Sequence, residues 1–110
     1  MTVGLTATLA LDSGENVMDD PALFPPRLRP FAEAHGRALS TLDTTSLSWA
    51  VLAPPAGFGT GHEQHYRLVA EPVTREQATA QLPHALYARA VTDELVTPTV
   101  HSRRVVVVPA

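Results

Sequence analysis

Glycines and histidines lie close together in the middle of the chain, in a stretch that reads PPAGFGTGHEQHYRL over residues 54–68. The glycines take alternate positions, at Gly57, Gly59 and Gly61. A dinucleotide-binding loop needs G-x-G-x-x-G directly between a strand and a helix, whereas this G-x-G-x-G precedes a strand pattern. A zinc-protease pair needs two histidines four apart on one helical face, whereas His62 and His65 are three apart in a loop. The spacing therefore favours a turn after a buried strand over a phosphate or metal site.

A further histidine, His35, lies in a pattern typical of an amphipathic helix. Apolar residues recur at helical spacing after Pro30, which suits a first helical turn, and we predict a helix over residues 27–44. His35 shares a face with Phe31 and Leu39, so we expect it to point toward a sheet. It is either a core histidine with one satisfied nitrogen or an acid–base group, because the ordinary pKa of imidazole lies near neutral pH.

Apolar runs predict the strands that must position these residues. Residues 3–11 form a strand or an extended segment, and residues 65–73 form a strand that ends at a sheet edge because of its proline. Residues 47–55 and Arg103–Val108 have the content of strands buried on both faces, which is typical of parallel sheets. Residues 75–98 carry an apolar stripe and predict the second main helix. We expect an α/β fold with a mostly parallel sheet of about four strands and two main helices, in one domain over the whole chain.

Composition narrows the classes of partner. The chain has 110 residues and a net charge of −3, so it lacks the positive surface that nucleic acid or an anionic membrane attracts, and we expect neither as a partner. It contains no cysteine, which excludes disulfides and thiolate catalysis. We expect no metal site, and no serine lies in a G-x-S-x-G elbow. No stretch reaches 18 apolar residues and no signal-peptide pattern opens the chain, so we expect a cytoplasmic protein.

Three segments taken in order carry a family resemblance. SLSWAVLAPP at residues 46–55 is similar to an L-x-x-S-x-L-x-W-T-x-L-x-P segment, TGHEQHYRL at 60–68 to a T-G-x-Y-R stretch, and LPHALYARAVTDELVTP at 82–98 to a final helix. This series resembles the atypical short-chain dehydrogenase/reductases, the flavin-reductase-like NAD(P)H-binding proteins. The likeness spans nearly all of this chain and about the C-terminal half of a family member.

The resemblance implies a partial Rossmann-like layer that forms the substrate side of an NAD(P)H-dependent reductase. It implies a substrate loop formed by Pro54, Pro55, Gly57, Phe58 and His62. His35 takes the catalytic place, as a proton donor, although the Tyr-x-x-x-Lys pair of some relatives is Phe31 and His35 here. The family's glycine-rich βαβ unit is not in this sequence. We therefore expect no cofactor to bind this chain alone, and NAD(P)H to bind only if a partner supplies the glycine-rich half.

A sheet that lacks its family's other strands has an open apolar edge, which invites pairing. We expect a homodimer, or a complex with a separately encoded complementary half, through the 27–44 helix or a sheet edge.

Three functions remain open. The first is a truncated NAD(P)H-dependent oxidoreductase with a substrate-side cleft for a small molecule. The second is a non-catalytic dimerising or regulatory module, and the third is a small cofactor-free isomerase or cyclase that uses a histidine as its acid or base. The substrate stays open, as does whether Met1 is the natural start.

Overall fold

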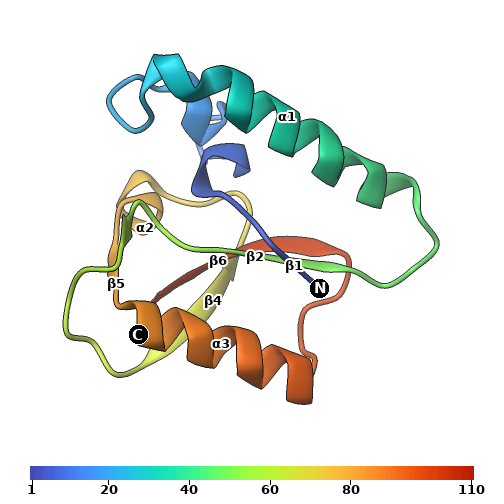
Figure 1. The fold of residues 1–110 in the computed structure, drawn as a ribbon, viewed down its shortest axis with the longest axis vertical. Coiled ribbons are helices and arrows are strands. Elements are labelled where there is room, and N and C mark those ends of the chain that lie inside the picture. The colour runs from blue at the N-terminus through green and yellow to red at the C-terminus, as the bar shows by residue number, and fades with distance from the viewer.

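The computed structural model describes all of residues 1–110 and has the predicted α/β fold, a mostly parallel four-stranded sheet with two main helices (Figure 1). The strands lie in the order β1 (Thr2–Val3), β2 (Ala50–Ala53), β6 (Arg103–Pro109) and β4 (Tyr66–Ala70). β1, β2 and β6 are parallel, and β4 runs antiparallel to β6 at the far edge. The prediction of an edge strand at residues 65–73 is therefore confirmed.

β6 is the central strand, and its valines are buried on both faces, as predicted. Val105 and Val107 pack with β2 and with helix α3 (His84–Val96) on one face. Val106 and Val108 belong to a second apolar cluster on the opposite face. Because side chains alternate along a strand, this one strand supplies both halves of the core.

Helix α3 and an irregular segment cover the two faces of the sheet. From α3, the buried side chains Leu86, Tyr87 and Ala90 lie on the first face. The opposite face is covered by residues from the N-terminal segment and from the stretch after β4, which includes the short helix α2 (Arg75–Ala78); they are Leu9, Leu11, Val17, Val73 and Ala78. The sheet is thus buried on both sides although only one face has a main helix packed directly on it.

Residues 3–11, predicted as a strand or an extended segment, form a strand only at their start and isolated bridges at Ala10 and Leu11. β1 ends at Val3, the N–H of Gly4 still donates to the Leu52 carbonyl at 2.7 Å, and a 3-10 turn, η1 (Thr6–Thr8), follows. The hydroxyl of Thr8 donates to the Leu5 carbonyl at 2.9 Å. Threonine hydroxyls that bond to the backbone compete with a strand ladder, and the apolar residues of this run serve instead to cover the sheet.

The predicted helix over residues 75–98 is two helices. Helix α2 (Arg75–Ala78) is short, and α3 begins only after a two-residue strand, β5 (Gln81–Leu82). Pro83 separates them, because proline disfavours helical backbone at the residue before it. β5 pairs in parallel with β3 (Gly57–Phe58), a second small sheet that the sequence did not predict.

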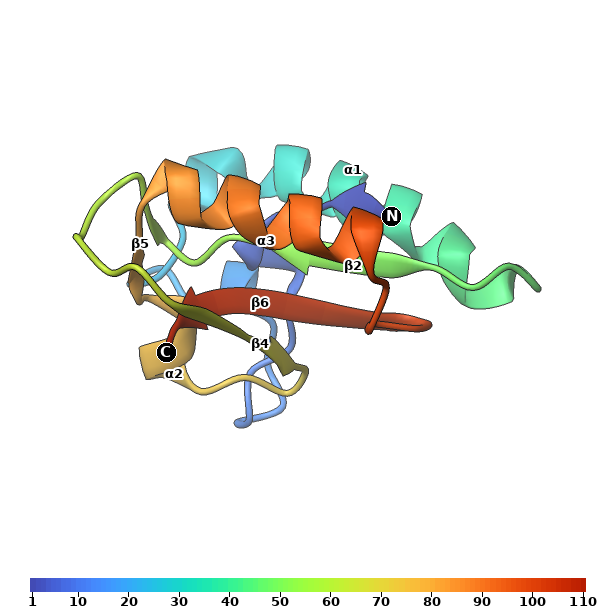
Figure 2. The ribbon, with the colours of Figure 1, turned by 90° about the horizontal axis from the view of Figure 1, so that it is seen from below.

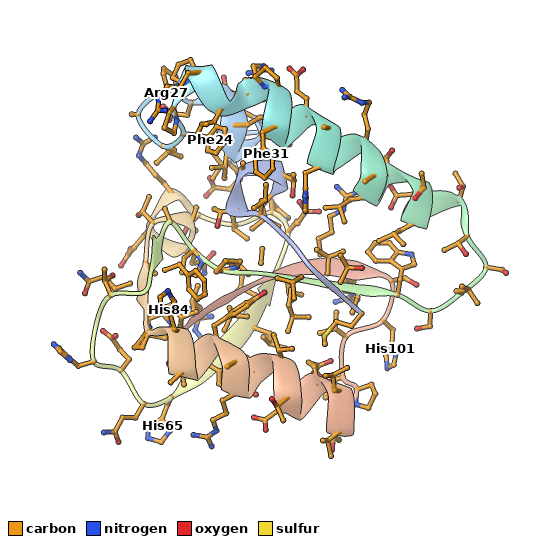
Figure 3. The ribbon with its side chains drawn as sticks, viewed as in Figure 1. Phe24, Arg27, Phe31, His65, His84 and His101 are labelled. Atoms are coloured by element: carbon orange, nitrogen blue, oxygen red, sulfur yellow. The ribbon has the colours of Figure 1, made fainter.

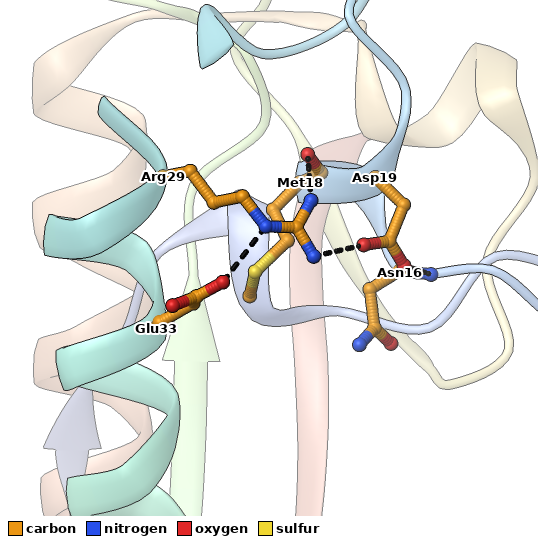
Figure 4. Close-up of polar contacts among 5 residues, drawn as sticks. All are labelled: Asn16, Met18, Asp19, Arg29 and Glu33. Carbon is orange, nitrogen blue, oxygen red and sulfur yellow. Dashed lines mark hydrogen bonds and ion pairs between the residues drawn. The ribbon is translucent and has the colours of Figure 1, made fainter. Parts of the chain in front are cut away.

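The helix predicted over residues 27–44 is confirmed. A 3-10 turn, η3 (Pro26–Leu28), leads into α1 (Arg29–Ser40), and a second turn, η4 (Thr41–Thr44), follows it. Arg29 ties the start of α1 to the preceding turn η2 (Val17–Asp19), as Figure 4 shows. Its guanidinium lies 2.8 Å from a carboxylate oxygen of Asp19 and 2.8 Å from one of Glu33. The Arg29 hydrogen bond to Asp19 lowers the pKa of that carboxyl.

The predicted packing of this helix on the sheet is wrong. α1 packs mainly against η1 and the turns at its own ends, because the N-terminal segment lies between it and the sheet (Figure 1). Ala32 and Leu39 are buried, but Phe31 is 61% exposed, and Ala34 and Ala38 are exposed too. Much of the apolar stripe that predicted the helix is therefore left without a partner in this chain.

The two main helices lie on opposite sides of β1 (Figure 2), and α3 also contacts β4, where the Tyr66 hydroxyl donates to Asp93 at 2.6 Å. Neither α1 nor α3, nor any shorter helix, has the length and apolarity needed to cross a lipid bilayer.

Truncation of Leu52 tests the sheet core. Leu52 is fully buried between β1 and β6, so we expect Leu52→Ala to lower the free energy of unfolding by about 2–5 kcal/mol. Leu47→Ala is the matched control, because Leu47 is 73% exposed, and it should change stability by less than about 0.5 kcal/mol. Urea unfolding measures both, and equal losses would mean that the sheet does not form the core.

Candidate functional site

The loop over residues 54–62 follows β2 at its carboxyl end. In open α/β sheets, ligands bind outside the carboxyl ends of the parallel strands, so this is the end at which a site is expected. The loop is firmly held: the hydroxyl of Thr6 donates to the Pro54 carbonyl, and the N–H of Ala56 donates to the Ala78 carbonyl at 2.8 Å. Pro55 is fully buried. The loop predicted to bind substrate is therefore held in place by hydrogen bonds and burial.

The glycines of the loop are required by packing within the chain. A Cβ on Gly57 would lie 2.5 Å from the Ala80 carbonyl oxygen, which is too close for any side chain. Gly59 has a φ of +91°, and a Cβ there would lie 2.7 Å from Nε2 of His84. After Gly61 the chain continues to β4, and no helix begins there. These residues do not fit a dinucleotide pyrophosphate, which needs free backbone N–H groups at a helix start.

An aromatic cluster forms where the loop meets the start of α3. The Phe58 ring contacts His84 edge-on with centroids 4.5 Å apart, and Tyr87 edge-on with centroids 5.1 Å apart. Phe58 remains 40% exposed, and His84 is exposed at the first turn of α3 (Figure 3). The cluster therefore presents one aromatic surface and one imidazole to solvent beside the loop.

Tyr87 holds this cluster against the sheet. Its hydroxyl donates to the Leu52 carbonyl at 2.8 Å, and burial raises the pKa of Tyr87 to about 12. A phenol with that pKa stays neutral at physiological pH, so Tyr87 has a positioning role. His84 is the exposed titratable side chain in contact with the loop.

His84 and Tyr87 were not among the predicted site residues. Both lie within residues 75–98, whose apolar stripe predicted a helix rather than a site. The signal was available in Pro83, because a proline often marks the start of a helix and so places His84 in a first helical turn. To use this signal one must divide the 75–98 stripe into α2 and α3, and the apolar pattern is continuous across that division.

His35 lies apart from this cluster, on α1. It is half-buried, its Nε2 is enclosed without a hydrogen-bond partner, and the Phe31 ring lies 6.4 Å away between centroids. α1 packs on η1, and η1 in turn bonds to Pro54, so the two parts of the predicted site are joined only through that turn. His62 is exposed in the loop. No group of three or more histidine, aspartate or glutamate side chains is placed to hold a metal ion.

The main surface hollows lie elsewhere. None of the five is lined by His35 or by the 54–62 loop. One groove of about 400 Å³ runs between β4, β6 and His101 at the opposite end of the strands. The loop and its aromatic neighbours therefore form a single wall rather than an enclosed pocket.

Solved structures match this fold. A protein of Streptococcus pneumoniae TIGR4 described as a "putative NADH-flavin reductase" is 27% identical with a TM-score of 0.78, over 98% of this chain and 54% of that one. A "putative epimerase" from Bacteroides thetaiotaomicron is 25% identical with a TM-score of 0.80, over 97% of this chain and 51% of that one. A "putative exported protein" from Burkholderia pseudomallei is 26% identical with a TM-score of 0.79, over 96% and 52%.

The matches show that this chain has the Rossmann-like α/β fold of these structures, and it spans about half of their length. No protein-family model matches the sequence, and no curated protein matches it significantly.

A pair of glycine substitutions tests the loop geometry. Gly14 and Gly59 have nearly the same φ, +93° and +91°, but a Cβ on Gly14 meets nothing within 4 Å. Gly14→Ala should cost only the backbone strain, about 1–3 kcal/mol, and Gly59→Ala should cost more because of His84. Urea unfolding measures these costs. The double variant Gly59→Ala/His84→Ala should lose only the backbone strain, because it lacks the ring that the new Cβ would meet. Equal costs at both glycines would show that His84 does not pack on the loop.

The tyrosines provide a pH test. Burial raises the pKa of Tyr87, and the hydrogen bond to Asp93 raises that of Tyr66, each from 10.0 to about 12. Because the fold favours the neutral phenols, the stability they contribute is complete below pH 10 and is lost as the pH rises toward 12. Absorbance titration should detect phenolate near pH 12 in the folded protein, and Tyr66→Phe should leave the Tyr87 titration in place. Ionisation of Tyr87 near pH 10 before unfolding would disprove its burial.

Proposed function

We propose that this chain forms the substrate-side half of an NAD(P)H-dependent oxidoreductase of the atypical short-chain, flavin-reductase-like kind. The observation that carries the proposal is the likeness, over 98% of the chain, to a protein described as a "putative NADH-flavin reductase". The loop at the carboxyl end of β2, where α/β sheets bind ligands, supports it.

The roles follow from the contacts of the loop. Pro54 and Pro55 end β2, and Phe58 offers its exposed ring as a flat wall for a substrate or nicotinamide ring. His84 would donate or accept a proton beside that wall, because its imidazole is exposed there and contacts the Phe58 ring. The phenol of Tyr87 fixes the wall from behind.

We propose that His35 and His62 act as the family resemblance implies, as a proton donor and as part of the substrate loop. The Nε2 of His35 is enclosed and has no hydrogen-bond partner, so a ligand of the assembled protein would have to reach it before it could donate a proton.

The dinucleotide would be held largely by residues outside these 110. The space beside Gly57, Gly59 and Gly61 is occupied by other atoms of this chain, so these glycines form no binding site for a pyrophosphate. We therefore propose NAD(P)H as a cofactor of the assembled protein and assign no step of its chemistry to this chain.

A non-catalytic dimerising or regulatory module is the second candidate. It is favoured by Phe31, which takes the place of the family's tyrosine and has no hydroxyl to donate a proton. A cofactor-free isomerase or cyclase would need a histidine inside a closed pocket, and the histidine-lined groove at His101 is open to solvent.

A chimera tests the proposal. The part of the Streptococcus pneumoniae protein that the match does not cover is fused to the N-terminus of this chain, and NADPH binding is followed by the fluorescence of Trp49. We expect the chimera, but not the 110-residue chain, to bind NADPH and to reduce free flavin. Phe58→Ala should lower kcat/KM about tenfold, since an aromatic contact contributes about 0.5–1.5 kcal/mol beyond its buried area.

Leu47→Ala is the control outside the loop and should leave kcat/KM unchanged. A chimera that binds NADPH but shows the same turnover with alanine at Phe58, His84 and His35 would reject the catalytic role and favour the non-catalytic module.

A further inference from the structure

The β1 edge of the sheet is uncovered. β1 has β2 as its single neighbour, and Val3 is 53% exposed. The N–H of Gly4 bonds inward to Leu52. Since successive residues of a parallel strand direct their backbone groups to opposite sides, Val3 directs its N–H and C=O outward, as edge strands do.

The two edges of the sheet differ in kind. β4 is antiparallel, and an antiparallel strand commonly closes one edge of an otherwise parallel sheet. β1 belongs to the parallel series with β2 and β6, and parallel strands occur in sheets that are covered on both faces. β4 is therefore a typical last strand of such a sheet, whereas β1 can accept a further parallel strand.

Helices α1 and α3 lie on either side of β1 (Figures 1 and 2). Leu95 of α3 is 65% exposed and lines a groove with Met1 and Ala50 at the start of the strands. α1 keeps Phe31 uncovered, with two alanines on the same helix. We call the β1 edge with these two helices the β1 slot.

We infer that the β1 slot docks a complementary α/β polypeptide, which adds a strand parallel to β1 and packs its own apolar surface on α1 and α3. The inference rests on the proposed function and names the partner of that half-site. The matched structures support this occupant, because this chain covers 51–54% of them and about half of each has no counterpart here.

A second copy of this chain fits the slot less well. A two-fold symmetric dimer would pair β1 with its copy in antiparallel fashion. A strand of two residues offers few hydrogen bonds for such a pair, whereas a complementary half would also cover the exposed side chains Phe31 and Leu95.

The chain contains no cysteine, so a cysteine introduced by substitution is its single thiol and can be labelled specifically. Val3→Cys and Leu47→Cys each introduce a single thiol, the first in the β1 slot and the second outside it. Each variant is co-expressed with the uncovered half of the Streptococcus pneumoniae protein, purified through a tag on this chain, and treated with a maleimide. Mass spectrometry follows the labelling of this chain.

We expect a one-to-one complex in which the thiol at position 3 reacts at least about tenfold more slowly than in the chain alone, as occupancy at ten times Kd requires. The thiol at position 47 should react equally in both. Leu95→Lys should weaken the complex, and Leu47→Lys should not. Absence of a complex, an unprotected thiol at position 3, or a homodimer that protects it would each overturn the inference.

The two proposals fail separately. A complex with position 3 protected that binds no NADPH would preserve the docking surface and reject the proposed function. A chimera that reduces flavin while the separate halves do not associate would do the reverse.

Discussion

The structure depends on the burial of β6 between β2 and β4. Its four central valines supply both faces of the core, and α3 and the covering N-terminal segment pack on those faces. The hydrophobic free energy of these side chains is available only when β2 lies on one side and β4 on the other. The last strand of the chain must therefore be in place before the sheet is stable.

This arrangement explains why the candidate site consists of a single surface beside the 54–62 loop and why the β1 edge of the sheet has no outer neighbour. β2 delivers the 54–62 loop to the carboxyl end of the sheet, and α3, which packs on β2 and β6, brings His84 and Tyr87 to the same loop. Nothing in these residues faces that wall from across the crevice, and nothing pairs with β1 from outside. The matched structures are about twice as long as this chain, so a polypeptide that could fill both gaps has no counterpart in these residues.

Apolar content predicted the core well. The strands at 47–55 and 103–108 and the helix at 27–44 are strong patterns that the tertiary structure keeps. The 3–11 run and the 75–98 helix failed, because a covering segment has the composition of a strand without its hydrogen bonds, and because Pro83 divides a stripe that looks continuous. Of the site, the loop at Pro54–His62 could be predicted, but the contact of Phe58 with His84 depends on a break that periodicity does not show.

Amide hydrogen exchange tests the central claim most directly, which is that these residues fold by themselves around β6 and leave β1 open. We predict the strongest protection at Val105–Val108 and Leu52, fast exchange at Val3, and protection at Val3 only when the complementary half is present. Equal protection of β1 and β6 in the chain alone, or no protected β6, would contradict this account.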